Sequence, residues 1–263
     1  MEKLELLPGP IDGRGDATPT IAFVLRGFLS HEECQHYIRL AEARGLEPCE
    51  YDPKVRQTER LELQSESIGL LLWRRAREFL EDDIVLKKNA IPDDGGWREG
   101  IPRNTPEGTW IPTRVNQPIR ICRYQPGGFF LPHHDGTCHH HPTDERSLQT
   151  IMVYLNDDFR GGPTQFYSSK QRHYCPGDPA NRIHSFQPQT GDALIFFSAI
   201  THDGGAVTEG QKYILRSEIM YQRKQDDLIS RAVEPDHDDT IALVPDVDGG
   251  FDYPSDDDEE EAE

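Results

Sequence analysis

Short apolar runs separated by turn residues dominate the second half of the chain. From Ile119 onward, the runs IRICRY, TIMVYL, PTQFYS, DALIFF and YILRSEIMY are rich in β-branched and aromatic residues, and Gly, Pro, Asp and Asn stand between them. Regularly spaced short strands of this kind are typical of a double-sheet jelly roll or a barrel. The pattern therefore predicts a mainly β fold, with a double-stranded β-helix (jelly-roll) core at about residues 118–223.

The first half of the chain combines one strand with helical periodicity. The run IAFVLRGF at 21–28 predicts a strand. Ser30, with Glu33 three residues later, forms a capping-box signature, so we expect a helix from there to about Ala43. A second helix is predicted over 65–81, because apolar residues recur there at helical spacing. These residues are Ile68, Leu71, Leu72 and Phe79.

Two further segments lack such periodicity. Residues 86–116 are rich in Pro, Gly and Asp, which predicts a long loop of the kind that serves as a lid or a binding segment. Trp97 and Trp110 lie in this loop and are candidates for lining a substrate groove. Residues 235–263 are loaded with Asp and Glu and predict a flexible acidic tail, because they bury too little apolar surface to offset chain entropy. We therefore expect a single domain at 1–234, followed by the tail.

Charge and composition exclude some classes of partner. The net charge of -19 argues against a surface built for nucleic-acid backbones, which requires clustered Lys and Arg. No apolar run approaches the ~20 residues of a membrane span, and the N-terminus MEKLELLPGP does not resemble a secretory signal. The five cysteines show no framework spacing. We expect no nucleic-acid and no membrane partner, and an intracellular location that is cytoplasmic, with a nuclear one also compatible.

A candidate metal site lies in the segment YQPGGFFLPHHDG. In a strand, residues i and i+2 project to one face, so His133 and Asp135 can converge on one ion while His134 points away. His202, at the end of a distant predicted strand, is a suitable third ligand. Two His and one carboxylate leave open positions that suit non-haem Fe(II). Zinc hydrolases use the same ligand types, so this set alone does not decide the metal.

Two cations on the last predicted strand favour an anionic ligand beside the metal. Lys212 and Arg216 are four residues apart and face the same way in a strand. A buried cation needs an anionic partner, and a dicarboxylic cosubstrate would supply one. Arg216 can share the carboxylate of that cosubstrate, bind the substrate, or pair with Glu218 or another acid.

These features together resemble the 2-oxoglutarate/Fe(II) dioxygenases of the prolyl 4-hydroxylase type. The resemblance covers about residues 123–223. It rests on the motif from Tyr124 through Gly127 and Phe130 to His133 and Asp135, and on further motifs along the chain. These are Gly161-Gly162-x-Thr164-x-Phe166, Gly191-Asp192, and His202 followed by Gly210-x-Lys212.

The resemblance implies a role for each matched residue. His133, Asp135 and His202 would bind Fe(II), and Lys212 would take the distal carboxylate of 2-oxoglutarate. Tyr124 and Thr164 correspond to residues that help to hold this cosubstrate, and Arg216 is a further cofactor-binding candidate. The implied reaction uses O₂ and 2-oxoglutarate to hydroxylate a C–H bond, with release of succinate and CO₂ and with ascorbate as a candidate reductant.

The substrate that the resemblance favours is a prolyl or other residue of a peptide or protein. The same chemistry on a free amino acid or another small molecule is the alternative. A zinc-dependent hydrolase and a catalytically dead jelly-roll binding module are more distant alternatives. Lys212 argues against the hydrolase, and the retained ligand set argues against the dead module.

Other residues are weaker candidates for the site. Arg56 and Arg60 precede the second predicted helix and are candidates to reach the cleft. The run Cys138–His141 directly follows the motif that contains Asp135. We interpret it as a loop beside the mouth of the site rather than as a second metal centre, because no partner cluster lies at ligand spacing.

Overall fold

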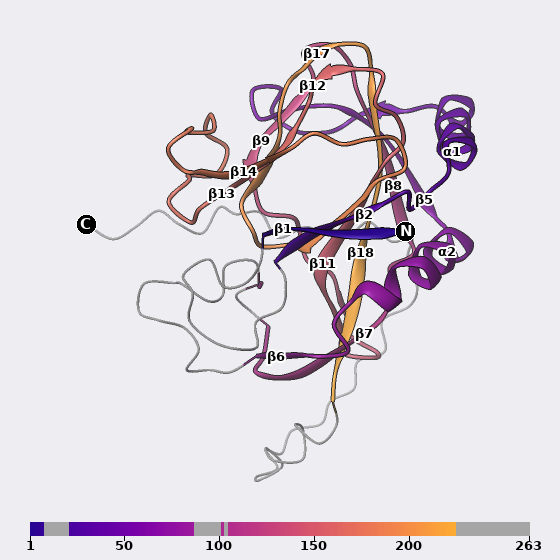
Figure 1. Ribbon diagram of the computed structural model, residues 1–263, viewed down its shortest axis with the longest axis vertical. Coiled ribbons are helices and arrows are strands. Elements are labelled where there is room, and N and C mark those ends of the chain that lie inside the picture. The colour runs from indigo at the N-terminus through magenta and orange to yellow at the C-terminus, as the bar shows by residue number, and fades with distance from the viewer. Residues whose placement is uncertain (8–20, 87–100, 103–104, 225–263) are drawn as a thin grey trace, which may run out of the picture.

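The computed structural model describes residues 1–7, 21–86, 101–102 and 105–224. Two antiparallel sheets form its body (Figure 1). The order of strands along the larger sheet is β1 (Glu2–Leu7), β2 (Ala22–Arg26), β15 (Ala193–Phe197), β11 (Glu145–Tyr154), β18 (Lys212–Arg223), β8 (Pro118–Tyr124), β5 (Glu59–Gln64) and β3 (Glu47–Pro48). Three more strands extend it: β7 (Gly108–Val115) pairs with β18, β6 (Ile84–Leu86) with β7, and β10 (His139–His140) with β11.

The smaller sheet completes a jelly roll. Its order is β14 (Arg182–Phe186), β13 (Thr164–Tyr167), β16 (His202–Gly204), β9 (Phe129–His133) and β4 (Arg56–Gln57). From β8 to β18 the chain passes repeatedly from one sheet to the other, which is the winding of a double-stranded β-helix. A short ribbon of β12 (Arg160–Gly161) and β17 (Val207–Glu209) lies outside both sheets. The predicted jelly-roll core is confirmed.

The apolar runs of the sequence form the core between and around these sheets. All five residues of β15 are buried, and in β11 only Arg146 is not. A strand that is buried on both faces reads as a continuous apolar run, as ALIFF does. The larger sheet is therefore mainly apolar on its buried faces. The polar residues that face the interior from β18 and β8 are exceptions to this pattern.

Two helices lie side by side along one flank of the larger sheet, next to β5 and β8 (Figure 1). Helix α1 (His31–Arg44) begins with the predicted capping box: the Glu33 backbone N–H donates to the Ser30 hydroxyl at 3.1 Å, and the Ser30 N–H donates to the Glu33 carboxylate at 2.8 Å. Helix α2 (Glu66–Ala76) continues into a 3₁₀ turn, η1 (Arg77–Phe79). Arg75 forms an ion pair of 2.7 Å with Glu33, so the two helices are tied together.

Three features differ from the sequence-based expectations. Within the expected loop at 86–116, residues 108–115 form strand β7, so the expectation of one continuous loop is wrong there. Trp110 is fully buried in β7 and donates from its indole N–H to the Pro106 carbonyl at 3.1 Å, so it does not line a groove. Strands β1, β5 and β14, and shorter strands such as β3, β6 and β10, were not predicted.

Trp97 and the acidic tail at 235–263 lie outside the described residues. Among the helices that the structure describes, none has both the length and the apolar character that crossing a lipid bilayer requires.

The capping box predicts a measurable contribution to stability. Ser30→Ala removes an acceptor for a helix N–H, and we expect the free energy of unfolding to fall by about 1 kcal/mol. Urea denaturation measures this change. Ser67→Ala is the matched control, because the hydroxyl of this residue contacts the Ser65 hydroxyl and no backbone N–H; a loss as large as that of Ser30→Ala would contradict the interpretation.

Candidate active site

The three predicted metal ligands meet inside the jelly roll. In the pairing of β9 with β16, His133 lies directly opposite His202. Asp135 follows β9, and its backbone N–H donates to the Ser198 carbonyl at 2.8 Å. Each imidazole Nε2 lies 3.7 Å from an Asp135 carboxylate oxygen. All three side chains are buried, and their ligand atoms lie within 4.8 Å of one another, which is the spacing a single ion requires.

The residue between the two motif ligands points elsewhere, as the strand period predicts. The His134 ring packs against the His173 ring at a centroid distance of 4.0 Å, and its Nε2 lies 3.1 Å from the Thr201 hydroxyl. His134 therefore takes no part in the triad.

Hydrogen bonds leave one nitrogen of each triad histidine available for a metal. His133 Nδ1 lies 2.7 Å from the Leu131 carbonyl, and His202 Nδ1 lies 2.9 Å from the Ile200 carbonyl. A carbonyl accepts only, so each Nδ1 carries the proton and each Nε2 lone pair faces Asp135. Burial lowers the pKa of both imidazoles, that of His202 to about 4, so both are neutral at pH 7. Neutral imidazole is the form that binds metals.

Asp135 is held as a carboxylate by its neighbours. Burial alone would raise its pKa, but the Arg216 guanidinium holds the pKa well below its usual range. The Thr150 hydroxyl donates to one carboxylate oxygen at 2.6 Å, and Arg216 approaches the other at 2.8 Å. These contacts fix the orientation of the carboxylate toward the two histidines.

Arg216 also begins a row of alternating charges on the interior face of the larger sheet. It lies 3.9 Å from Glu218, which accepts a hydrogen bond from Arg120 at 2.5 Å, and Arg120 lies 3.3 Å from Glu62. Of the roles open to Arg216, pairing with an acid is thus the one that the contacts display, and the acid is Asp135. Its guanidinium lies at the metal end of the interior, whereas Lys212 is four residues away along β18.

The predicted cosubstrate residues gather around Lys212. This side chain is 3 % exposed, and its ammonium donates to the Gly162 carbonyl at 2.7 Å. It lies 5.6 Å from the ring centroid of Tyr124, its direct neighbour across β18 and β8, and 5.3 Å from that of Tyr154. The Tyr154 and Thr164 hydroxyls are 2.7 Å apart. Burial lowers the pKa of Lys212 to about 8, and no ion pair forms to it within the described residues.

Aromatic residues lie beside the three metal-ligand candidates. The sequence predicted only some of their contacts. The Phe130 ring is stacked on the His133 ring, with centroids 3.5 Å apart. The Arg56 guanidinium carbon lies 4.5 Å from the Phe130 centroid, so Arg56 does reach the site. Phe130 belongs to the recognised motif, but its stacking on a metal ligand was not anticipated. Arg60 lies on β5 and pairs with Glu62 at 3.7 Å.

The Cys138–His141 run remains outside the triad. His139 Nε2 lies 2.8 Å from an Asp144 carboxylate oxygen, and the rings of His139 and His141 are 4.1 Å apart. Among the described residues, only His133, Asp135 and His202 form a group of three or more side chains spaced for one metal ion. His139 and His140 form strand β10, so the expectation that this run is a loop is wrong for these two residues.

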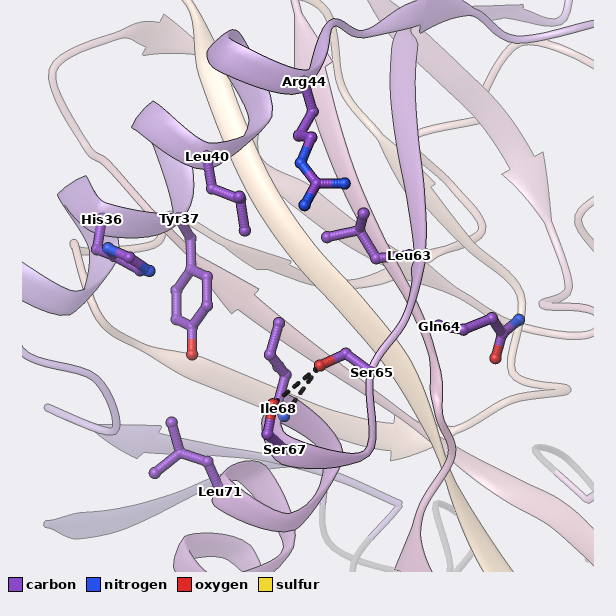
Figure 2. A pocket seen from close by; sticks show the side chains of 10 residues that line it. All are labelled: His36, Tyr37, Leu40, Arg44, Leu63, Gln64, Ser65, Ser67, Ile68 and Leu71. Carbon is purple, nitrogen blue, oxygen red and sulfur yellow. Dashed lines mark hydrogen bonds between the residues drawn. The ribbon is translucent and has the colours of Figure 1, made fainter.

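A separate pocket of about 500 Å³ lies between α1, α2 and β5. Figure 2 shows Tyr37 and Leu40 from α1 facing Ser65, Ile68 and Leu71 across it. None of its lining residues belongs to the triad or to the Lys212 cluster. It lies on the outer side of the larger sheet, so it is not the proposed reaction site.

Comparison with known proteins gives the family of this core. Residues 119–217 match the family model described as the 2OG-Fe(II) oxygenase superfamily. The match covers the jelly-roll core, and the predicted resemblance to 2OG-Fe(II) oxygenases of the prolyl 4-hydroxylase type is confirmed. The match to this superfamily implies Fe(II), 2-oxoglutarate and O₂ as cofactor and cosubstrates.

Individual relatives are similar over most of this chain. The "Probable prolyl 4-hydroxylase 7" of Arabidopsis thaliana is 28% identical over 74% of the chain and 61% of its own length. "Probable prolyl 4-hydroxylase 6" of the same plant is 28% identical over 73% of the chain and 66% of its own length. The chain thus spans less than two thirds of these curated relatives. A solved structure, the viral collagen prolyl hydroxylase of Paramecium Bursaria Chlorella virus-1, matches with a TM-score of 0.48 and 22% identity, over 81% of this chain and 99% of that one.

The hydrogen bond from Thr150 to Asp135 predicts that loss of the Thr150 hydroxyl weakens metal binding. Thr150→Val removes the donor to Asp135 with little change in volume, and we expect the affinity for Mn(II) or Fe(II) to fall roughly 10- to 100-fold. An anaerobic metal titration measures it. Thr164→Val is the matched control, because its hydroxyl contacts Tyr154 and not the triad; equal losses in both variants would contradict the assignment.

Proposed function

We propose that this protein is a Fe(II)- and 2-oxoglutarate-dependent dioxygenase that hydroxylates a prolyl residue of a peptide or protein, with release of succinate and CO₂. The observation that carries the proposal is the placement of two complementary sites in one interior. One is a buried group of two neutral histidines and one carboxylate, and the other is a buried lysine with no carboxylate within ion-pair distance among the described residues. A metal cation suits the first site and a dicarboxylate suits the second.

The residues of the site would have separate roles in binding iron and 2-oxoglutarate. His133, Asp135 and His202 would hold Fe(II) through Nε2, a carboxylate oxygen and Nε2. Iron bound there supplies the oxidising chemistry together with O₂ and 2-oxoglutarate. Lys212 would pair with the distal carboxylate of 2-oxoglutarate, and Tyr124 and Thr164 would hold that end in place. Arg216 lies beside Asp135, so it would contact the end of 2-oxoglutarate that binds the metal.

The same interior disfavours the alternative chemistries. A zinc hydrolase requires a general base beside the metal and has no use for a buried lysine that faces an anion pocket. A dead binding module has no reason to keep both Nδ1 hydrogen bonds that set the metal-binding tautomer of the histidines. The substrate proposal follows the relatives, which are named as prolyl 4-hydroxylases. Free proline or another small molecule is the second candidate, since it requires the same interior.

The reaction itself is tested by the origin of the inserted oxygen. Incubated with Fe(II), 2-oxoglutarate, ascorbate and ¹⁸O₂, the protein should convert a proline-containing peptide or free proline into a product that carries one ¹⁸O. It should also form succinate in equal amount, and mass spectrometry measures both. His133→Ala should abolish both products and metal binding. An oxygen that derives from water, or turnover retained in His133→Ala, would refute the proposal.

Lys212→Met separates cosubstrate binding from folding. We expect the affinity for 2-oxoglutarate to fall by at least ~10-fold, because a charge-assisted hydrogen bond is lost. The melting temperature should not fall. Burial lowers the Lys212 pKa to about 8 from 10.5, so the charged lysine is a cost to the fold below pH 8, and this cost disappears as the pH rises toward 10.5.

Calorimetric titration with 2-oxoglutarate and thermal unfolding at pH 7 and pH 10 measure these effects. Any stability advantage of Lys212→Met over the parent protein should therefore shrink at the higher pH. Unchanged affinity for 2-oxoglutarate in a well-folded variant would remove Lys212 from the site.

A further inference from the structure

Arg56 stands apart from the other arginines around the site because it has no anionic partner in the part of the chain that the structure describes. Its neighbours on β5 and β8 are all paired: Arg60 with Glu62, Arg120 with Glu218, and Arg123 with Glu59 and Glu42. Within the described residues, no carboxylate lies within ion-pair distance of Arg56, and its Nε is buried without a hydrogen-bond partner. Its side-chain hydrogen bond goes to the weak acceptor Cys122 Sγ at 3.8 Å.

This lack of a partner is unexpected in so acidic a protein. With a net charge of -19, the chain has many carboxylates that could pair with Arg56. Burying a guanidinium without an anion is costly, since the lost hydration is not replaced. Two aromatic faces compensate in part, because Phe130 lies 4.5 Å and Tyr51 5.4 Å from the guanidinium carbon. A partly buried cation without an anion at ion-pair distance is suited to bind an anionic ligand.

The position of Arg56 connects the surface with the metal ligands. Tyr51 is 46% exposed and meets Phe130 edge to face at 5.7 Å. Phe130 in turn is stacked on His133. Arg56 therefore lies between an exposed tyrosine and the phenylalanine that covers a proposed iron ligand, on the edge strand β4 of the smaller sheet. A substrate that reaches the metal along Tyr51 and Phe130 would pass the Arg56 guanidinium.

We propose that Arg56 is the receptor for a carboxylate of the substrate, so that this enzyme selects acid-bearing targets. The inference rests on the proposed function and names the substrate class of that same site. A guanidinium binds a carboxylate through two parallel hydrogen bonds, and the contacts with Phe130 and Tyr51 help to hold the Arg56 guanidinium in place. The carboxylate has two sources: an Asp or Glu side chain near the target proline, or the α-carboxylate of a C-terminal or free proline.

Lys212 makes the cosubstrate an unsuitable partner for Arg56. The distal carboxylate of 2-oxoglutarate is matched by Lys212 and the hydroxyl groups around it. The other end of the cosubstrate is matched by the metal and by Arg216 beside Asp135. Arg56 is thus the cation near the triad that the proposed reaction leaves without an anion.

Peptide binding to the full chain loaded with Mn(II) and 2-oxoglutarate tests the proposal without requiring turnover. Fluorescence anisotropy would compare labelled proline peptides in matched pairs: Glu against Gln next to the proline, and a free C-terminal carboxylate against its amide. We expect the acid of at least one pair to bind roughly 10- to 100-fold more tightly than its neutral counterpart. The pair that discriminates identifies the source of the carboxylate.

Variants at two neighbouring arginines complete the test. Arg56→Gln should reduce the preference for the acid to within about twofold, and Arg56→Lys, which keeps the charge but not the fork of donors, should retain part of it. Arg60→Gln is the matched control and should behave as the parent protein, because Arg60 already pairs with Glu62. The affinity for 2-oxoglutarate should stay unchanged in all three variants.

Each contrary result has a distinct meaning. If the parent protein binds 2-oxoglutarate but shows no preference for an acid in either pair, or binds none of the peptides at millimolar concentration, the receptor role of Arg56 is wrong. Weakened binding of 2-oxoglutarate in Arg56→Gln would overturn it as well and make Arg56 a cosubstrate residue. If the parent protein does not bind 2-oxoglutarate at all, the proposed function itself fails.

Discussion

The antiparallel pairing of β9 with β16 is the constraint on which the site depends. It places His133 opposite His202, although the two residues are far apart in the sequence. A slip of β16 by one residue would turn His202 to the other face of the smaller sheet, away from His133, because the side-chain period of a strand is two. The neighbouring pair of Phe166 with His202 in β13 and β16 locks the same register from the other side. The geometry of the three proposed ligands is therefore a property of the whole smaller sheet.

Buried charge links this geometry to function. Most ionised groups of the interior are satisfied internally: Asp135 by Thr150 and Arg216, and Glu218 by Arg120. Lys212 and Arg56 are the exceptions near the triad within the described residues, and both are cations. A protein that is strongly acidic overall thus presents positive charge where its reaction would take place. Two cations with no described carboxylate at ion-pair distance suit two anionic ligands, which the proposals identify as the cosubstrate and a substrate carboxylate.

The sequence was most informative where a short motif and a regular period agree. The capping box at Ser30 predicted the start of α1, and the apolar runs predicted the central strands β2, β8, β11, β15 and β18 of the larger sheet, because their burial leaves little choice of side chain. Strand β7 escaped prediction because Gly108 and Pro112 interrupt its pattern and its apolar residues are few. Strand β5 carries alternating Leu and charged residues over only six positions, which is too short for a clear period.

The partners of individual side chains were the hardest to predict. The strand period placed Lys212 and Arg216 on one face, but the choice of Asp135 as the acid beside Arg216 depends on where β9 ends in space. Likewise, nothing in the sequence indicated that Arg56 would lie over Phe130, since β4 is a two-residue strand at the edge of a sheet. Such contacts arise from pairing between strands that are distant in the sequence, which a local pattern does not encode.

The central claim is that one interior holds both the metal and 2-oxoglutarate. The most direct measurement is an anaerobic titration of the Fe(II)-loaded protein with 2-oxoglutarate, followed by the weak visible absorption of the iron–oxoacid chelate. The account predicts that the band appears with one equivalent of cosubstrate bound per chain, and that it is absent in Asp135→Ala. Iron binding without a band at millimolar 2-oxoglutarate would contradict the account, because the metal and the cosubstrate would then not share one site.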